Sequence, residues 1–306
     1  MERRDHIDTT GALALTGFAL LLGFNQVVIK LSAQGIQPVF MAGLRSVGAV
    51  VILWLWLRLR ARGQGHEPGR GKRGSLMLAR RAWGAGLLAG LLFTVEFVLL
   101  YLALDWTSVA RASIIFYSMP VHLALAAHFL LPGERLTGPR VGGLLLAMAG
   151  VAWVLARPGP DAASLWGDLA ALGAAIAWAG IALVVRITPL ADEKPEPQLM
   201  SQLVISAVLL LAVAPLFGPV LRNPTGWHVA GIGFQIVAVA SFGYLLWLVL
   251  MKLYPASGVA SFAFLSPVFG VLCGWLILSE PVGVEIFGGL GMVALGLVLI
   301  NRRNSG

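Results

Sequence analysis

The amino-acid sequence predicts an all-α integral membrane protein whose ten transmembrane helices form two five-helix repeats of inverted topology. Three observations lead to this prediction: a very apolar composition, ten runs of spanning length, and an internal repeat. The chain has 306 residues, of which 58% are hydrophobic and only 12% are charged. Soluble domains carry about 25% charged residues, and a soluble fold of this length cannot bury so much apolar surface. The composition therefore places the chain in a membrane.

A helix needs about 20 mostly apolar residues to cross a bilayer. Ten runs meet this requirement: residues 11–33, 38–59, 82–104, 107–130, 138–156, 165–187, 198–219, 228–251, 257–279 and 282–301. Most of the links between them are short and carry proline, glycine or charge, as in "LPGERLTGPR" and "RPGPDAAS". The longest link contains "RARGQGHEPGRGKRG", which is too polar and rich in glycine to fold alone. The sequence thus leaves no room for a soluble domain.

Basic residues set the expected orientation, because lysine and arginine accumulate in the cytoplasmic links of membrane proteins. With the N-terminus inside, the inner links hold seventeen of the 22 lysine and arginine residues, many of them between Arg58 and Arg81. The outer links hold only Arg157 and Arg222. We therefore expect both termini in the cytoplasm. The net charge of +8 reflects these membrane anchors, and we expect no nucleic-acid partner.

Two segments of the chain, residues 109–154 and 255–300, resemble each other. In each, small residues precede a proline in mid-helix, and a glutamate follows at the next helix junction; the matched residues are Pro120 with Pro267, and Glu134 with Glu280. Each proline removes an intrahelical hydrogen bond and is expected to bend its helix around a cavity. We interpret each glutamate as structural, accepting backbone N–H groups at the start of the following helix.

Glycines extend this match at the same distances from each glutamate. The matched sets are Gly142, Gly143 and Gly150 in the first segment, and Gly288, Gly289 and Gly296 in the second. A spacing of seven keeps two glycines on one helix face, where another backbone can approach closely. We therefore expect one repeat at 1–157 and a second at 158–306. Five helices are an odd number, so the second copy enters the membrane from the opposite side, as in many secondary transporters.

Several motifs resemble the EamA family of the drug/metabolite transporter superfamily. They are "GFNQVVIK" in the first run, "PVFMAGLRSVGA" in the second, the proline-to-"GERL" segment, and its echo "SEP" in the second half. The opening is most similar to bacterial exporters of amino acids and related metabolites. The resemblance implies a ten-helix fold in the bacterial inner (plasma) membrane, with a central substrate cavity between the repeats. It also implies export of small metabolites, chiefly amino acids or related carboxylates, by alternating access.

Four ionisable residues stand out inside the expected spans: Lys30, Arg45, Glu96 and Arg111. Such residues are costly in a bilayer and usually face a cavity or a partner. A rise of about 1.5 Å per residue places all four in the outer half at overlapping depths. We predict a shared substrate site with surplus positive charge for a carboxylate, and Glu96 as the candidate for proton coupling. The alternatives are structural: snorkelling for the lysine and Arg111, and fixed pairing for Arg45 and Glu96.

Neutral side chains complete the predicted site. Asn25 and Gln26, near the middle of the first run, can hydrogen-bond a substrate or a neighbouring helix. Five tyrosines and tryptophans could form aromatic walls: Tyr101, Tyr117, Trp178, Tyr244 and Trp247. Of these, Tyr117 and Trp178 lie deepest and are expected to line the cavity. Gln202 and Gln235 are weaker candidates, and Pro120 and Pro267 shape the cavity.

The sequence favours a secondary transporter over other classes of membrane protein. It contains no metalloprotease motif, no recognisable nucleophile or acid cluster and no Walker sequence, so we expect neither an enzyme nor direct use of ATP. We expect no metal, no cofactor, and a monomer or homodimer among membrane lipids. An exporter of drugs or other hydrophobic small molecules, and a receptor or scaffold that transports nothing, remain the alternatives.

Overall fold

The computed structural model describes residues 7–63, 77–131, 138–157, 164–254, 262 and 265–301. Within these ranges the chain is helical apart from its links and one isolated β-bridge between Ile36 and Leu221. The main helices are α1 (Thr9–Ala33), α2 (Pro38–Gly63), α3 (Trp83–Trp106), α4 (Val109–Phe116), α5 (Met119–Leu130), α6 (Gly138–Ala156), α7 (Ser164–Ile187), α8 (Pro195–Val213), α9 (Gly226–Phe234), α10 (Tyr244–Leu253), α12 (Leu265–Leu278) and α13 (Val284–Asn301). The prediction of an all-α integral membrane protein is confirmed.

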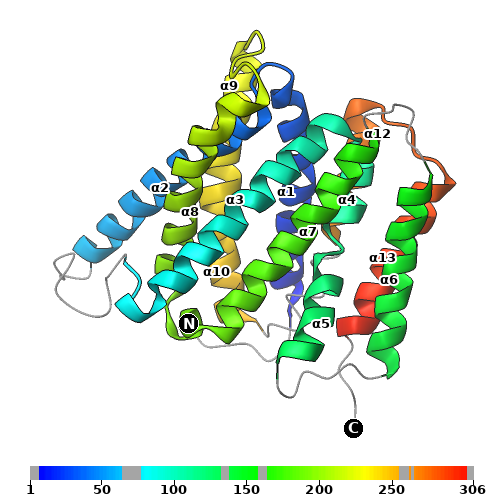
Figure 1. Ribbon diagram of the computed structural model, residues 1–306, viewed down its shortest axis with the longest axis horizontal. Helices are drawn as coiled ribbons and strands as arrows, with labels where there is room; N and C mark the ends of the chain where they lie inside the picture. Colours follow the sequence, from blue (N-terminus) through cyan, green and yellow to red (C-terminus); the bar gives the residue numbers. More distant parts are fainter. Residues whose placement is uncertain are drawn as a thin grey trace.

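Eight helical stretches in the described ranges are long and apolar enough to cross a membrane, and α12 and α13 are shorter apolar helices near the last two expected spans. α1 begins and α13 ends at the same end of the molecule, the lower end in Figure 1. The opposite end, where α1 and α3 finish and α4 and α7 begin, is called the outer end, after the orientation expected from charge.

Two predicted spans are not continuous α-helices, which corrects the expectation. The run 107–130 divides into α4 and α5, which are separated by Tyr117 and Ser118. Here the Tyr117 N–H donates to the Ser113 carbonyl at 3.0 Å, and the Ser118 hydroxyl donates to the Ile115 carbonyl at 2.6 Å. These bonds close α4 just before Pro120, whose ring nitrogen cannot continue the hydrogen-bond ladder.

The run 228–251 also departs from a single α-helix. Between α9 and α10 lies a nine-residue π-helical segment, Gln235–Gly243, called η4 in the element order. Inside it the Ser241 hydroxyl donates to the Ile236 carbonyl, five residues earlier, at 2.7 Å. The chain is therefore wider here than an α-helix, and its side chains point in directions that a period of 3.6 does not predict.

The main contacts between helices have a regular pattern: each is matched by one in which the two repeats have changed places. α6 packs along α13 and α2 along α8, so these helices meet their counterparts. The contact of α3 with α7 is matched by that of α1 with α9 and the π-helical segment. The contact of α1 with α12 is matched by that of α7 with α4 and α5. Figure 1 shows α6 and α13 side by side at the right of the molecule. This arrangement agrees with the predicted inverted repeat.

Apart from Gly142, which has open space around it, the matched glycines lie at the contact of α6 and α13. A methyl group at Gly296 would lie 2.5 Å from the Gly143 carbonyl oxygen. A methyl group at Gly289 would lie 3.1 Å from the Gly150 carbonyl oxygen. The later glycine of one helix meets the earlier glycine of the other, so the two helices are antiparallel. The prediction that these glycines admit another backbone is confirmed, and that backbone is the matching helix of the other repeat.

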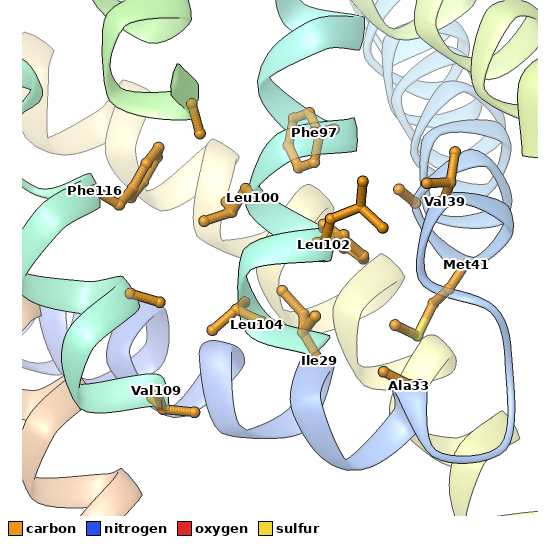
Figure 2. Close-up of a cluster of buried hydrophobic side chains, with 14 of the residues drawn as sticks. Ile29, Ala33, Val39, Met41, Phe97, Leu100, Leu102, Leu104, Val109 and Phe116 are labelled. Carbon is orange, nitrogen blue, oxygen red and sulfur yellow. The ribbon is translucent and has the colours of Figure 1, made fainter. Parts of the chain in front are cut away.

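The largest apolar core lies where α1, α2 and α3 meet near the outer end. Ile29, Met41, Phe97 and Leu104 are buried there, as Figure 2 shows. This core surrounds the polar side chains of α2 and α3 with apolar walls, and it thereby sets the environment of the candidate site.

Candidate functional site

Glu96 of α3 is buried, with only 4% of its surface exposed. Its Oε2 atom has no hydrogen-bond partner in the described part of the chain. Leaving a buried polar atom without a partner costs about 1 to 3 kcal/mol, and more for a charged group. A carboxylate held in this way is available to a proton or to a cationic group of a ligand.

Arg45 of α2 is the cation whose charge acts on Glu96. Its guanidinium carbon lies 4.5 Å from the ring centroid of Phe97, the residue after Glu96, in a cation–π contact. Its Nε atom is buried and has no hydrogen-bond partner among the described residues. The structure therefore brings two of the predicted site residues together, and each retains an unused polar atom.

Tyr101 and Gln235 adjoin this pair. The Tyr101 hydroxyl donates to the Gln235 Oε1 atom at 2.6 Å, and both side chains are fully buried. The Tyr101 hydroxyl also interacts with Arg45. The Gln235 Nε2 group is 3.5 Å from the Met41 sulfur. The sequence made Gln235 only a weaker candidate, since an unbroken apolar run gives no sign that a π-helical segment places this amide against α3.

A second polar cluster lies where the two proline-containing segments meet. Gln26 of α1 accepts a hydrogen bond from Ser113 of α4, and it also interacts with Tyr117. Tyr117 in turn interacts with Ser266, which directly precedes Pro267 in the first turn of α12. These contacts join the two repeats near the predicted cavity.

The remaining neutral candidates have less defined contacts. Asn25 is 8% exposed, and its Oδ1 atom has no hydrogen-bond partner among the residues that the structure describes. Trp178 of α7 is partly buried and packs against the apolar core around α1, α2 and α3. Pro120 lies in the first turn of α5, directly after the break, as expected for a proline that shapes the path of a helix.

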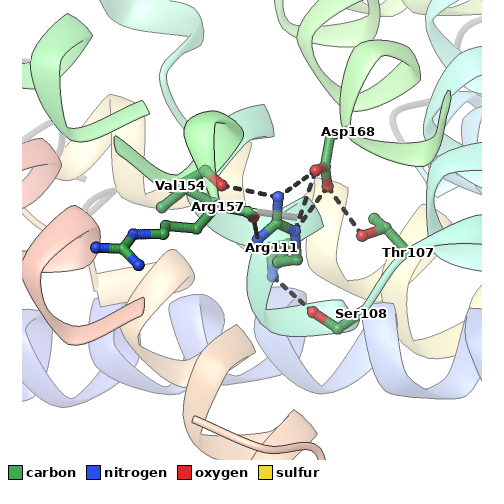
Figure 3. A network of polar contacts seen from close by, with 6 residues as sticks. All are labelled: Thr107, Ser108, Arg111, Val154, Arg157 and Asp168. Atoms are coloured by element: carbon green, nitrogen blue, oxygen red, sulfur yellow. Dashed lines mark hydrogen bonds and ion pairs between the residues drawn. The ribbon is translucent and has the colours of Figure 1, made fainter. Parts of the chain in front are cut away.

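The structure places Arg111 in a different network from Glu96. Its guanidinium forms an ion pair with Asp168 of α7, with Nε lying 3.1 and 3.0 Å from the two carboxylate oxygens. It also donates to the carbonyls of Val154 at 2.7 Å and Arg157 at 2.8 Å, at the end of α6. The Thr107 hydroxyl completes the arrangement by donating to Asp168 at 2.8 Å. Figure 3 shows Arg111 among these partners, with Thr107 bound to Asp168.

Asp168 was missed at the sequence level. It lies in the first turns of the apolar run 165–187, and only 1% of it is exposed. Asp168 is therefore a further buried carboxylate, besides Glu96 and Glu280, in the described part of the chain. One feature of the sequence could have identified Asp168: it is an acidic residue inside the expected run, not in the link before it.

Lys30 lies in the same outer region as Arg111. Its ammonium group donates to the carbonyls of Leu104, at 3.1 Å, and Thr107. These carbonyls belong to the end of α3, where helices leave backbone oxygens without intrahelical partners. The four ionisable residues thus fall into two groups. Arg45 and Glu96 are neighbours, whereas Lys30 and Arg111 bind protein groups at the outer end.

Glu280 is buried and bonds backbone N–H groups, as predicted, but at another helix. It accepts from Val109 at 2.8 Å and Ala110 at 3.1 Å, the first residues of α4. The expected partner was the helix that follows it, and this part of the prediction was wrong. Ser279 has a positive φ of 53°, which turns the chain so that the carboxylate faces α4. Its counterpart Glu134 lies outside the described residues.

No group of three or more potential metal ligands gathers in the described ranges. In the described ranges, four residues have a buried polar atom without a hydrogen-bond partner: Arg45, Glu96, Asn25, and Arg140 in the first turn of α6. The first three belong to the predicted site. Together they offer hydrogen-bond donors with positive charge and acceptors with negative charge, inside a wall of aromatic side chains. This chemistry suits a small polar molecule.

Comparisons with known proteins agree along the whole chain. The family model described as "EamA-like transporter family" matches residues 9–156 and again residues 165–302. A Bacillus subtilis (strain 168) protein called "Uncharacterized transporter YvbV" is 26% identical over 302 residues, which cover 97% of this chain and 93% of the relative. An Escherichia coli (strain K12) protein called "Probable amino-acid metabolite efflux pump" is 26% identical over 318 residues, covering 98% of this chain and 95% of that protein. A crystal structure at 22% identity has a TM-score of 0.61 and covers 94% of this chain and 96% of its own, so it shares the fold.

Proposed function

Because the chain belongs to the EamA-like transporter family, we propose that it exports small metabolites, chiefly amino acids or related carboxylates, by alternating access. It is a multi-pass membrane protein, and membership of the family makes a small molecule its substrate. The likeness to a relative named for amino-acid metabolite efflux supports the substrate class. We place the chain in the inner membrane of a bacterium, with both termini in the cytoplasm.

One observation supports this proposal: Glu96 is buried, Arg45 is partly buried beside it, and each has a buried polar atom without a hydrogen-bond partner among the described residues. A fixed structural ion pair would satisfy those atoms, since buried charges are retained at low cost only with good geometry and complete hydrogen bonding. Among the described residues, no ion pair within 4.0 Å joins the two. A zwitterionic substrate would supply both missing partners.

The roles of the site residues follow from their chemistry. Arg45 binds the substrate carboxylate, for which a guanidinium offers two parallel donors. Glu96 binds the substrate ammonium group and, between substrates, a proton. The free Oδ1 atom of Asn25 accepts a further N–H, while Tyr117 and Trp178 form aromatic walls.

The other predicted site residues act around this centre. Gln26 holds the proline-containing segments of the two repeats together through Ser113 and Tyr117. Lys30 and Arg111 hold neighbouring helices together at the outer end by binding carbonyls and Asp168.

The proposal is tested by counterflow, in which proteoliposomes loaded with an unlabelled amino acid take up the same labelled amino acid. Each of the twenty common L-amino acids is assayed with the wild type, Glu96→Gln and Arg45→Ala. We expect counterflow of at least one amino acid, a changed rate or pH dependence for Glu96→Gln, and a raised KM for Arg45→Ala. Asp192→Asn is the matched control, because Asp192 is an exposed carboxylate paired with Arg81 outside the site.

Two results would contradict the proposal. Absence of counterflow for all twenty amino acids by folded wild-type protein would remove this substrate class. A Glu96→Gln variant with unchanged rate and unchanged pH dependence would remove Glu96 from the transport cycle.

A further inference from the structure

Gln235 occupies a distinctive place between the repeats. It is the first residue of the π-helical segment, it comes from the second repeat, and none of its surface is exposed. π-Helical turns are rare and occur frequently at functional sites. Because the segment is wider than an α-helix, it places the amide of Gln235 against α3 of the first repeat, where Tyr101 lies.

The hydrogen bond between Tyr101 and Gln235 has a defined direction. The Oε1 atom of an amide can only accept, so the Tyr101 hydroxyl commits its proton to Gln235. The lone pairs of the hydroxyl oxygen then remain available to donors. Arg45 has only donors to offer, and it is the charged side chain that interacts with this hydroxyl.

We propose that Gln235 is a positioning residue for the substrate: it orients the Tyr101 hydroxyl, which in turn fixes the Arg45 guanidinium beside Glu96. The inference rests on the proposed function in one respect, that Arg45 binds a substrate carboxylate. The bond between Gln235 and Tyr101 crosses from the second repeat to the first. The orientation of Arg45 therefore depends on how the two repeats are placed relative to each other, which links affinity for the carboxylate to conformation.

Gln235→Met tests this inference, because methionine nearly matches glutamine in size and removes the strong acceptor. Without that acceptor the Tyr101 hydroxyl turns its proton elsewhere, and Arg45 loses a fixed partner. For the amino acid with the largest counterflow signal, we expect KM to rise about tenfold, the effect of about one well-placed hydrogen bond, while kcat changes much less. Inhibition by the methyl ester of the same amino acid should be unchanged, because the ester has no carboxylate for Arg45.

Gln202→Met is the matched control. Gln202 of α8 is also a buried glutamine inside a span, and in the described part of the chain no hydrogen bond joins it to Tyr101 or Arg45. A general effect of removing a buried amide would appear in both variants. An equal rise of KM in Gln202→Met and Gln235→Met would overturn the inference, as would an equal loss of affinity for the amino acid and its methyl ester.

A double-mutant cycle tests the relay without any substrate. Tyr101→Phe, Gln235→Met and the double variant are purified in detergent, and their melting temperatures are compared with that of the wild type. If the hydrogen bond exists as described, Gln235→Met lowers the melting temperature of the wild type but changes that of Tyr101→Phe little. Strictly additive shifts would overturn the relay whether or not the protein transports amino acids. If the double-mutant cycle shows coupling but no amino acid gives counterflow, the proposed function is refuted and the contact between Tyr101 and Gln235 is still supported.

Discussion

Removal of the Asp168 charge is the most informative perturbation of the outer end. The carboxylate and Arg111 form an ion pair whose side chains are 1% and 6% exposed, so solvent screens it little. Removing one partner of such a pair leaves an uncompensated buried charge and costs about 3 to 5 kcal/mol. Asparagine retains an oxygen that can accept the Thr107 hydroxyl, so we expect a loss near the lower end of that range for Asp168→Asn. Arg111→Met should be similar, because it leaves the carboxylate unpaired.

The double variant separates a structural role for Arg111 from a role in binding substrate. Arg111→Met combined with Asp168→Asn leaves no unpaired charge, so its loss of stability should fall about 2 kcal/mol or more below the sum of the single losses. Stability is measured by SDS-induced unfolding in detergent. If Arg111 only holds the outer end, counterflow survives in the double variant.

Two results would refute this reasoning about Arg111 and Asp168. Additive losses of stability would show that the pair is not coupled. Lost counterflow in a well-folded double variant would return Arg111 to the substrate site. Asp192→Asn controls for the loss of a carboxylate, because its partner is Arg81 in an exposed pair, and it should change stability by less than about 0.5 kcal/mol.

Three further predictions concern the same framework. Glu280→Ala removes the acceptor for two N–H groups of α4 and should lower stability by about 1 to 3 kcal/mol in the same unfolding assay; no change would remove its capping role. Gly296→Leu should prevent close packing of α6 on α13 and lower the yield of folded protein in size-exclusion chromatography, whereas Gly142→Leu, with open space around it, should be tolerated; equal yields would contradict the packing. Arg222→Gln breaks a partly exposed ion pair with Asp105, so we expect a loss of stability below about 1 kcal/mol by SDS unfolding, and a larger loss would indicate a buried network.

The boundaries of several helices could be predicted from the sequence because local chemistry determines them. α6 coincides with the expected run 138–156, which a charged link and the "RPGPDAAS" link enclose. α1 begins two residues before the expected run because Asp8 caps it, with the Gly11 N–H donating to the carboxylate at 2.8 Å. The helix face that carries the glycines could also be predicted, because a spacing of seven places two glycines on one face whatever the partner helix is.

The partners of the charged residues could not be predicted, because the depth of a residue in the membrane does not determine which side of its helix the side chain leaves from. Arg111 and Glu96 were expected at overlapping depths, yet Arg111 faces α6 and α7 while Glu96 lies near α2. The π-helical segment could not be predicted for a related reason. Its residues are apolar apart from Gln235 and Ser241, so nothing in the pattern distinguishes one helical period from another.

The contact of α6 with α13 also restricts how the repeats can rearrange. Two backbone-to-backbone approaches, one at Gly143 with Gly296 and one at Gly150 with Gly289, lie along a single line and are exchanged by the symmetry of the repeats. Drawing the repeats apart would open both approaches at once. Rotation about that line leaves both intact. The packing of α6 on α13 therefore favours rotation of the repeats about this contact over their separation.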